Sequence, residues 1–160
     1  MDILTDKGQQ SAKDEKDAIN IWLNRYPAFS YIHTNKDRES AVDGFIVKDG
    51  SIISIVETKC RYGLTLAKFM NEYEGMWLIT FEKLVVARSI SRKLCSPLTG
   101  FLYLVEEKTL LFKKIIDENG EFISGNMMIK NTQTQRTIND KNQISRNNAF
   151  INMNDAKVLR

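Results

Sequence analysis

Two carboxylates and a lysine stand at the ends of one apolar stretch of this chain. Asp43 precedes the stretch, and Glu57-Thr58-Lys59 closes it. A hard cation such as Mg²⁺ prefers oxygen ligands and is usually held by one or two carboxylates together with water and phosphate. A lysine beside such a pair could orient or activate an attacking water. These residue types therefore indicate metal-dependent phosphodiester hydrolysis.

The turn inside this stretch decides whether the carboxylates meet. Residues 45–47 and 52–56 are β-branched or aromatic, and residues 48–51 between them predict a hairpin. A two-residue Asp49-Gly50 loop would place Asp43 on the opposite face from Glu57. A three-residue loop over 48–50, with Gly50 in the left-handed position, would pair Asp43 with Ile55 and put both carboxylates on one face. The candidate site rests on the three-residue loop, because only that loop puts Asp43, Glu57 and Lys59 on one face.

A structural interpretation competes with this one, because Asp before Gly often caps a strand and Glu-x-Lys is a common exposed strand ending. Residues 52–56, however, are apolar on both faces, as in a strand buried inside an α/β fold. Two carboxylates and a lysine at the end of such a strand favour a functional role.

Asp43 and Glu57-Thr58-Lys59, with the hairpin between them, resemble the PD-(D/E)XK nuclease superfamily, also called restriction-endonuclease-like; small phage-encoded members look most similar. Val42 stands where the family's name has proline. The resemblance implies an α/β fold with a mixed central sheet flanked by helices, in the order helix, three strands, helix, strand. It covers roughly residues 11–116, and we assign 1–119 to a nuclease core.

The resemblance also implies a cofactor and roles for the site residues. Mg²⁺ or Mn²⁺ would be held by Asp43, Glu57 and the backbone carbonyl of Thr58, while Lys59 would assist the nucleophile. The substrate would be DNA, and we favour an endonuclease over an exonuclease. A catalytically inactive nucleic-acid-binding module of the same fold is the alternative function. The residues leave open RNA as a substrate, junction resolution as the reaction and a homodimer as the assembly.

A further acid is expected on the first helix, where the superfamily often carries a Glu. Ser11 predicts the start of this helix and Pro27 its end. Glu15 lies on the same helical face as the apolar residues 18, 19, 22 and 26, whereas Asp14 and Asp17 fall off that stripe. Glu15 is therefore our candidate for an outer metal ligand or a water-positioning group. First-turn acidity favoured by the helix dipole explains Glu15 equally well.

Later segments complete the expected fold. Residues 64–74 predict a crossover helix, and MWLITF at 76–81 predicts a buried strand that ends at Glu82-Lys83. Residues 85–94 predict a helix with one basic face. Residues 101–105 and 110–116 predict a hairpin that extends the sheet.

Residues 120–160 differ in composition, being rich in Asn, Gln and Thr. From residue 130 onward, basic side chains exceed acidic ones by four, whereas the whole chain carries a net charge of +3. Amides and spaced cations suit contacts to phosphates and base edges. A solvated arm that wraps the core or a symmetry mate is the alternative. Our nucleic-acid contacts are Lys36, Arg38, Arg61, Lys68, Lys83, Arg136 and Arg146.

Several function classes are excluded. His33 is the single histidine, so zinc hydrolysis by paired histidines has no basis. A glycine-rich phosphate loop is absent from the sequence, so we expect no nucleotide cofactor. Cys60 and Cys95 are too few for a disulfide framework. No apolar run approaches membrane-spanning length, and we expect a cytoplasmic protein, which for a phage product means the host cytoplasm.

Overall fold

The computed structural model describes residues 5–35, 40–123, 127–135 and 141–160. In these residues the helices are α1 (Asp6–Arg25), α2 (Leu66–Glu72) and α3 (Phe81–Leu94). The strands are β1 (Ser30–His33), β2 (Gly44–Lys48), β3 (Ser51–Arg61), β4 (Met76–Thr80), β5 (Leu98–Leu104), β6 (Thr109–Ile116), β7 (Met127–Gln135), β8 (Gln143–Asn152) and β9 (Lys157–Leu159). Within this part of the chain, no helix has the length and apolar character needed to span a membrane.

The strands form two sheets. Six lie in the order β1-β2-β3-β5-β6-β9, and three in the order β4-β8-β7. β1, β2 and β3 are antiparallel neighbours, whereas β5 is parallel to β3. The expected α/β class with a mixed central sheet is therefore confirmed. Along the chain, α1, β1, β2 and β3 are followed by α2 and β4, and only then by α3 and β5.

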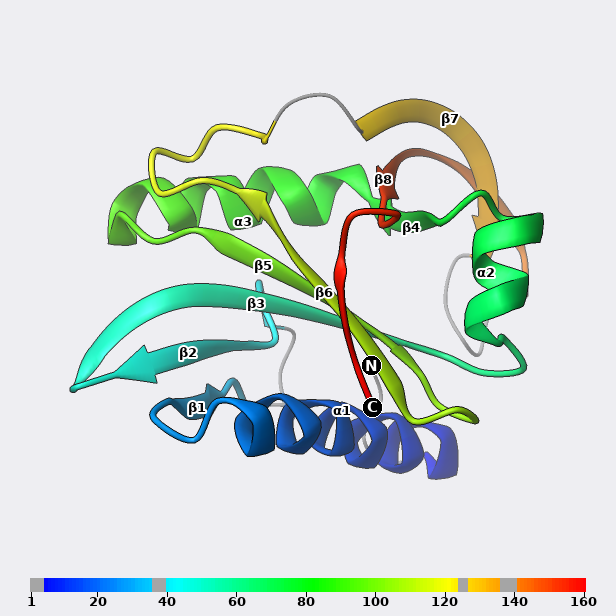
Figure 1. Cartoon of the computed structure of the whole chain (residues 1–160). Helices are drawn as coiled ribbons and strands as arrows, with labels where there is room; N and C mark the ends of the chain where they lie inside the picture. Colours follow the sequence, from blue (N-terminus) through cyan, green and yellow to red (C-terminus); the bar gives the residue numbers. More distant parts are fainter. Residues whose placement is uncertain (1–4, 36–39, 124–126, 136–140) are drawn as a thin grey trace.

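Helices cover both faces of the large sheet (Figure 1). α1 lies against one face, where Ala18, Ile19 and Trp22 pack with Val56 and the inner strands. α3 and the small sheet lie against the other face and enclose the second apolar cluster. The central strand β3 is buried continuously from Ser54 to Thr58, whereas Ile52 and Ile53 near its start are exposed, so the predicted burial of residues 52–56 holds only for 54–56.

The β2–β3 hairpin differs from the predicted one. Lys48 pairs with Ser51, so the loop has two residues, Asp49 and Gly50, and the predicted three-residue loop is wrong. Both loop residues have positive φ, 50° and 77°, which suits an Asp-Gly turn between strands. An irregularity then places one extra residue in β3, because Ile46 pairs with Ser54 while Val47 pairs with Ile52. The bulge shifts the register so that Gly44 faces Val56.

Two helix boundaries and the sheet position of one strand also differ from the expected fold. α1 begins at Asp6 rather than Ser11, because the Thr5 side chain caps it by accepting from Gly8 N at 3.1 Å. β4 lies outside the central sheet, since it pairs with β8. Glu82 and Lys83 do not end a strand but form the first turn of α3, where an acidic residue is favoured by the helix dipole.

Strands of the Asn-rich segment pair with strands formed earlier in the chain. β8 pairs with β4, and β9 pairs with β6. β7 and β8 make a long antiparallel ribbon with Gln135 opposite Gln143. Only its half nearer residues 127 and 151 lies beside β4, so the other half extends past the end of that strand. Ile151 and Met153 enter the apolar cluster under α3.

Candidate active site

Asp43 and Glu57 meet where β2 and β3 part. Asp43 directly precedes β2, whose first pair with β3 is Gly44 with Val56, and its carboxylate reaches the backbone of the residue after Glu57. Two backbone-linked hydrogen bonds hold the arrangement: Asp43 N donates to Val56 O at 3.0 Å, and Thr58 N donates to Asp43 Oδ2 at 2.8 Å. The charge of Asp43 also raises the pKa of Glu57. The structure therefore brings the two carboxylates close together, although the loop between β2 and β3 is not the one that we predicted.

Glu57 is a buried carboxylate with a cationic partner. The residue is 4 % exposed, and Lys83 Nζ in the first turn of α3 donates to its Oε1 at 2.5 Å. Burial and the nearby charge of Asp43 raise the pKa of Glu57 to about 7, while Lys83 opposes this shift. Two like charges are thus held close together in a poorly solvated place, an arrangement that a cation would relieve.

Lys59 follows Glu57 on the same face of β3, because side chains alternate along a strand. Burial among its neighbours and the positive charges of Arg61 and Lys83 lower the pKa of Lys59, whereas Glu57 and Asp43 raise it. Lys59 is exposed as a whole residue, so solvent screens part of this effect. The lysine therefore stands at the open rim of the site, beside the buried carboxylate.

Glu57 and Lys59 open into a polar pocket of about 230 Å³. Its other walls come from β4, the start of α3 and the β7–β8 ribbon. Three of the predicted nucleic-acid contacts meet here, namely Arg61, Lys83 and Arg146. The ribbon also contributes Thr134, Gln135 and Asn148. One buried carboxylate is thus faced by four cationic side chains from three elements, which is a charge distribution suited to a phosphodiester.

The other predicted contacts do not meet in this pocket. Lys68 lies on α2, 3.9 Å from Glu72, and does not line it. Lys36, Arg38 and Arg136 lie outside the described residues.

Glu15 is buried, but on the α1 side of the large sheet. It is 7 % exposed, and its charge raises the pKa values of Tyr31 and Cys60. Cys60 alternates with Glu57 and Lys59 along β3 and packs in the cluster under α1. Glu15 therefore approaches the site from the face opposite to Glu57, and its proposed catalytic role stays a prediction.

Tyr31 of β1 is a site residue that the sequence analysis missed. Burial, Asp43 and Glu15 raise the pKa of its phenol, in that order of effect, so the hydroxyl stays protonated among the carboxylates. Thr58 lies close enough to act on the same phenol. Even so, neither hydroxyl makes a hydrogen bond of normal geometry with a described residue. The available signal was alternation along the first strand of the expected fold, which puts one of Tyr31 and Ile32 inward.

Gly44 provides the space for Tyr31. A side chain at Gly44 would collide with the Tyr31 ring and hydroxyl. We therefore expect Gly44→Ala to lower the free energy of unfolding by about 1–3 kcal/mol, the usual cost of overpacking. Thermal melts would measure the loss. Adding Tyr31→Ala should recover part of it, and strictly additive effects of the two substitutions would contradict the contact.

The donor set fits a single hard cation. Asp43 and Glu57 offer carboxylate oxygens, and the N–H and C=O of a strand residue point to the same side, so the Thr58 carbonyl faces Asp43 as its N–H does. Mg²⁺ commonly uses one or two carboxylates and completes its shell with water and substrate oxygens. Among the described residues there is no group of three or more His, Cys, Asp and Glu side chains placed to hold a metal. The fit thus depends on the two carboxylates and the carbonyl.

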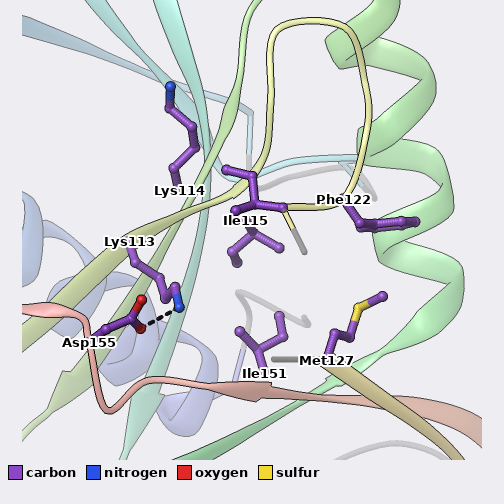
Figure 2. Close-up of a pocket in the computed structure, with 8 residues that line it drawn as sticks. Lys113, Lys114, Ile115, Phe122, Met127, Ile151 and Asp155 are labelled. Atoms are coloured by element: carbon purple, nitrogen blue, oxygen red, sulfur yellow. Dashed lines mark hydrogen bonds and ion pairs between the residues drawn. The ribbon is translucent and has the colours of Figure 1, made fainter. Parts of the chain in front are cut away.

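A pocket of about 240 Å³ on the outer side of β6 does not share this chemistry. Figure 2 shows apolar side chains around it, including Ile115, Phe122 and Ile151. At its edge Lys113 Nζ donates to Asp155 at 2.5 Å and to Asn152 O at 3.0 Å. Cation and carboxylate satisfy each other there, so this pocket is not the candidate site.

The chain matches no family model and no curated protein.

Proposed function

We propose that this protein is a metal-dependent nuclease of restriction-endonuclease-like fold that hydrolyses phosphodiester bonds in DNA. The observation that supports the proposal best is the closeness of Asp43 and Glu57 at the point where β2 and β3 separate, since Asp43 Oδ2 accepts from Thr58 N and the charge of Asp43 raises the pKa of Glu57. Lys59 follows on the same face, and the pocket in front is lined by Arg61, Lys83 and Arg146.

Each side chain has a distinct role in this proposal. Asp43, Glu57 and the Thr58 carbonyl would hold Mg²⁺ or Mn²⁺, which supplies charge neutralisation and a more acidic bound water. Lys59, with its lowered pKa, orients the attacking water and offsets negative charge that develops on the phosphate. Arg61, Lys83 and Arg146 bind the phosphates on either side of the cleaved bond.

A nucleic-acid-binding module without cleavage is the second candidate. The ion pair between Lys83 and Glu57 favours it, because this lysine already neutralises the buried carboxylate at 2.5 Å. In that case the cationic pocket would bind phosphate without a metal. The nuclease proposal requires the cation to share or displace this contact.

Cleavage with different cations tests the proposal. We expect supercoiled plasmid or single-stranded circular DNA to be cut with Mg²⁺ or Mn²⁺ and left intact in chelator. Ca²⁺ should bind with little turnover, because its coordination is longer and looser. The readout is conversion to nicked or linear DNA on a gel. Undiminished cutting in chelator would exclude the metal mechanism, and DNA binding without cutting under any cation would favour the binding module.

A further inference from the structure

A second pocket adjoins the polar pocket in front of Glu57 and Lys59 and shares Arg61, Trp77 and Leu78 with it. It encloses about 410 Å³ between the end of β3, α2 and β4, within the range of small-ligand sites. Its lining is largely aromatic and apolar and includes Tyr62, Phe69, Tyr73, Met76, Leu102 and Phe150. A polyanion bound in the polar pocket would therefore lie directly beside this apolar recess.

Tyr62 lines this recess where the chain leaves β3, and α1 holds its hydroxyl. Its hydroxyl donates to Asp14 Oδ2 at 2.6 Å, and the same buried carboxylate accepts from Gln10 Nε2 at 3.0 Å. Tyr62 nevertheless remains 52 % exposed. A ring that is anchored at one end loses little further freedom when a flat ligand stacks on it. This contact also explains why Asp14, which falls off the apolar stripe of α1, is buried.

Arg61 connects the two pockets. It lies on the same face of β3 as Glu57 and Lys59, so Lys59 and Arg61 start about 6.7 Å apart along the strand. Its Nη2 donates to Leu78 O at 3.4 Å, which holds the guanidinium at the wall between the pockets. Trp77 lines the same wall, and its buried indole N–H has no partner among the described residues. The wall between the pockets thus carries the Arg61 guanidinium, which can bind a phosphate, and the Trp77 N–H, which can donate to a ligand.

We infer that this recess binds an unpaired nucleobase next to the phosphate held at Glu57 and Lys59; the inference rests on the proposed function. Exposed bases stack on aromatic side chains whatever their identity, whereas a base inside a duplex must first be extruded from its stack. The substrate class is therefore nucleic acid with a single-stranded segment, such as a free strand, a flap or a loop, in preference to continuous duplex. DNA and RNA share this base chemistry.

Binding of labelled oligonucleotides in chelator tests the inference without cleavage. Fluorescence anisotropy would compare single-stranded DNA, single-stranded RNA of the same sequence and continuous duplex DNA at one salt concentration. Tyr62→Ala and Tyr62→Leu are expected to weaken single-strand binding about five- to a hundredfold, the usual loss for one stacked base. Tyr62→Phe should stay near wild type, because the ring remains. Duplex binding should be unchanged in all three, and the more tightly bound strand identifies the sugar.

Val85→Ala is the matched control, since Val85 is 49 % exposed on α3 and lines neither pocket. Single-strand binding by folded Tyr62→Ala and Tyr62→Leu that equals the Val85→Ala value would overturn the inference. Equal losses on single strands and duplex would overturn it as well. Metal-dependent cleavage with no dependence on Tyr62 would contradict this inference alone, whereas Tyr62-dependent binding without cleavage would contradict the nuclease proposal alone.

Discussion

Glu57→Gln and Asp43→Asn are each expected to lower Mg²⁺-dependent cleavage by more than about a hundredfold, the upper end of the loss found when a residue that only supports a metal ligand is removed. Each change replaces one charged oxygen ligand with a neutral amide of nearly the same shape. Because Asp43 and Glu57 lie close together and share one cation in this proposal, the double variant should be little worse than either single variant. Initial rates of plasmid or single-strand cleavage would measure the effect.

Asp155→Asn is the matched control for these variants. Asp155 accepts from Lys113 at 2.5 Å, as Glu57 does from Lys83, but it lies at the pocket on the outer side of β6. Its replacement removes the same kind of ion pair and should leave cleavage near the wild-type rate. Folded Glu57→Gln protein that cut at the rate of the control would show that the site is assigned to the wrong residues.

Stability should respond to pH and metal through Glu57. The pKa of Glu57 is raised from 4.5 to about 7 in the folded protein, so folding favours its protonated form. The corresponding stability is present below about pH 4.5 and is lost as the pH rises through about 7, amounting to at most about 3 kcal/mol. We therefore expect Glu57→Gln to be at least as stable as the wild type at pH 8, despite the loss of the Lys83 contact.

Mg²⁺ should restore the stability that the wild type loses at high pH. A cation shared by Asp43 and Glu57 binds the folded state and raises the melting temperature as its concentration exceeds the dissociation constant. At pH 8 the wild type should gain several degrees in millimolar Mg²⁺, whereas Glu57→Gln and Asp43→Asn should gain little. Melting curves at pH 5 and pH 8, with and without Mg²⁺, provide the readout. An identical Mg²⁺ effect on all three proteins would place the cation elsewhere.

Local sequence patterns predicted the elements around the site well. The apolar run from 52 to 56 predicted a buried strand, and β3 lies inside the large sheet with residues 54–56 buried and Ile52 and Ile53 exposed. Asp49-Gly50 predicted a turn, because few other residue pairs accept two positive φ values in succession. Residues 85–94 and 64–74 predicted helices that the structure has with shifted ends. These signals depend on neighbours in the chain, so they can be read without the fold.

These local patterns could not predict the register in which β2 pairs with β3. The bulge gives β3 one extra residue near Val47, and nothing in the apolar sequence of that strand predicts it. It nevertheless shifts by one residue the pairing between β2 and all later residues of β3, and so changes which side chains of the two strands share a face. The loop that we assigned between β2 and β3 was therefore wrong, and the closeness of Asp43 and Glu57 depends on the tertiary structure.

The chain by itself determined the chemistry that is available, namely two carboxylates, a lysine and many spaced cations without the histidines of a zinc site. The tertiary structure decided which of them meet. Lys83 reaches Glu57 because β4 leaves the central sheet and α3 starts beside β3, and Arg146 arrives on a strand that pairs with β4. The contact between Glu57 and Lys83, and the arrival of Arg146 in the same pocket, depend on strand pairing and buried packing, which residue types along the chain do not encode one by one.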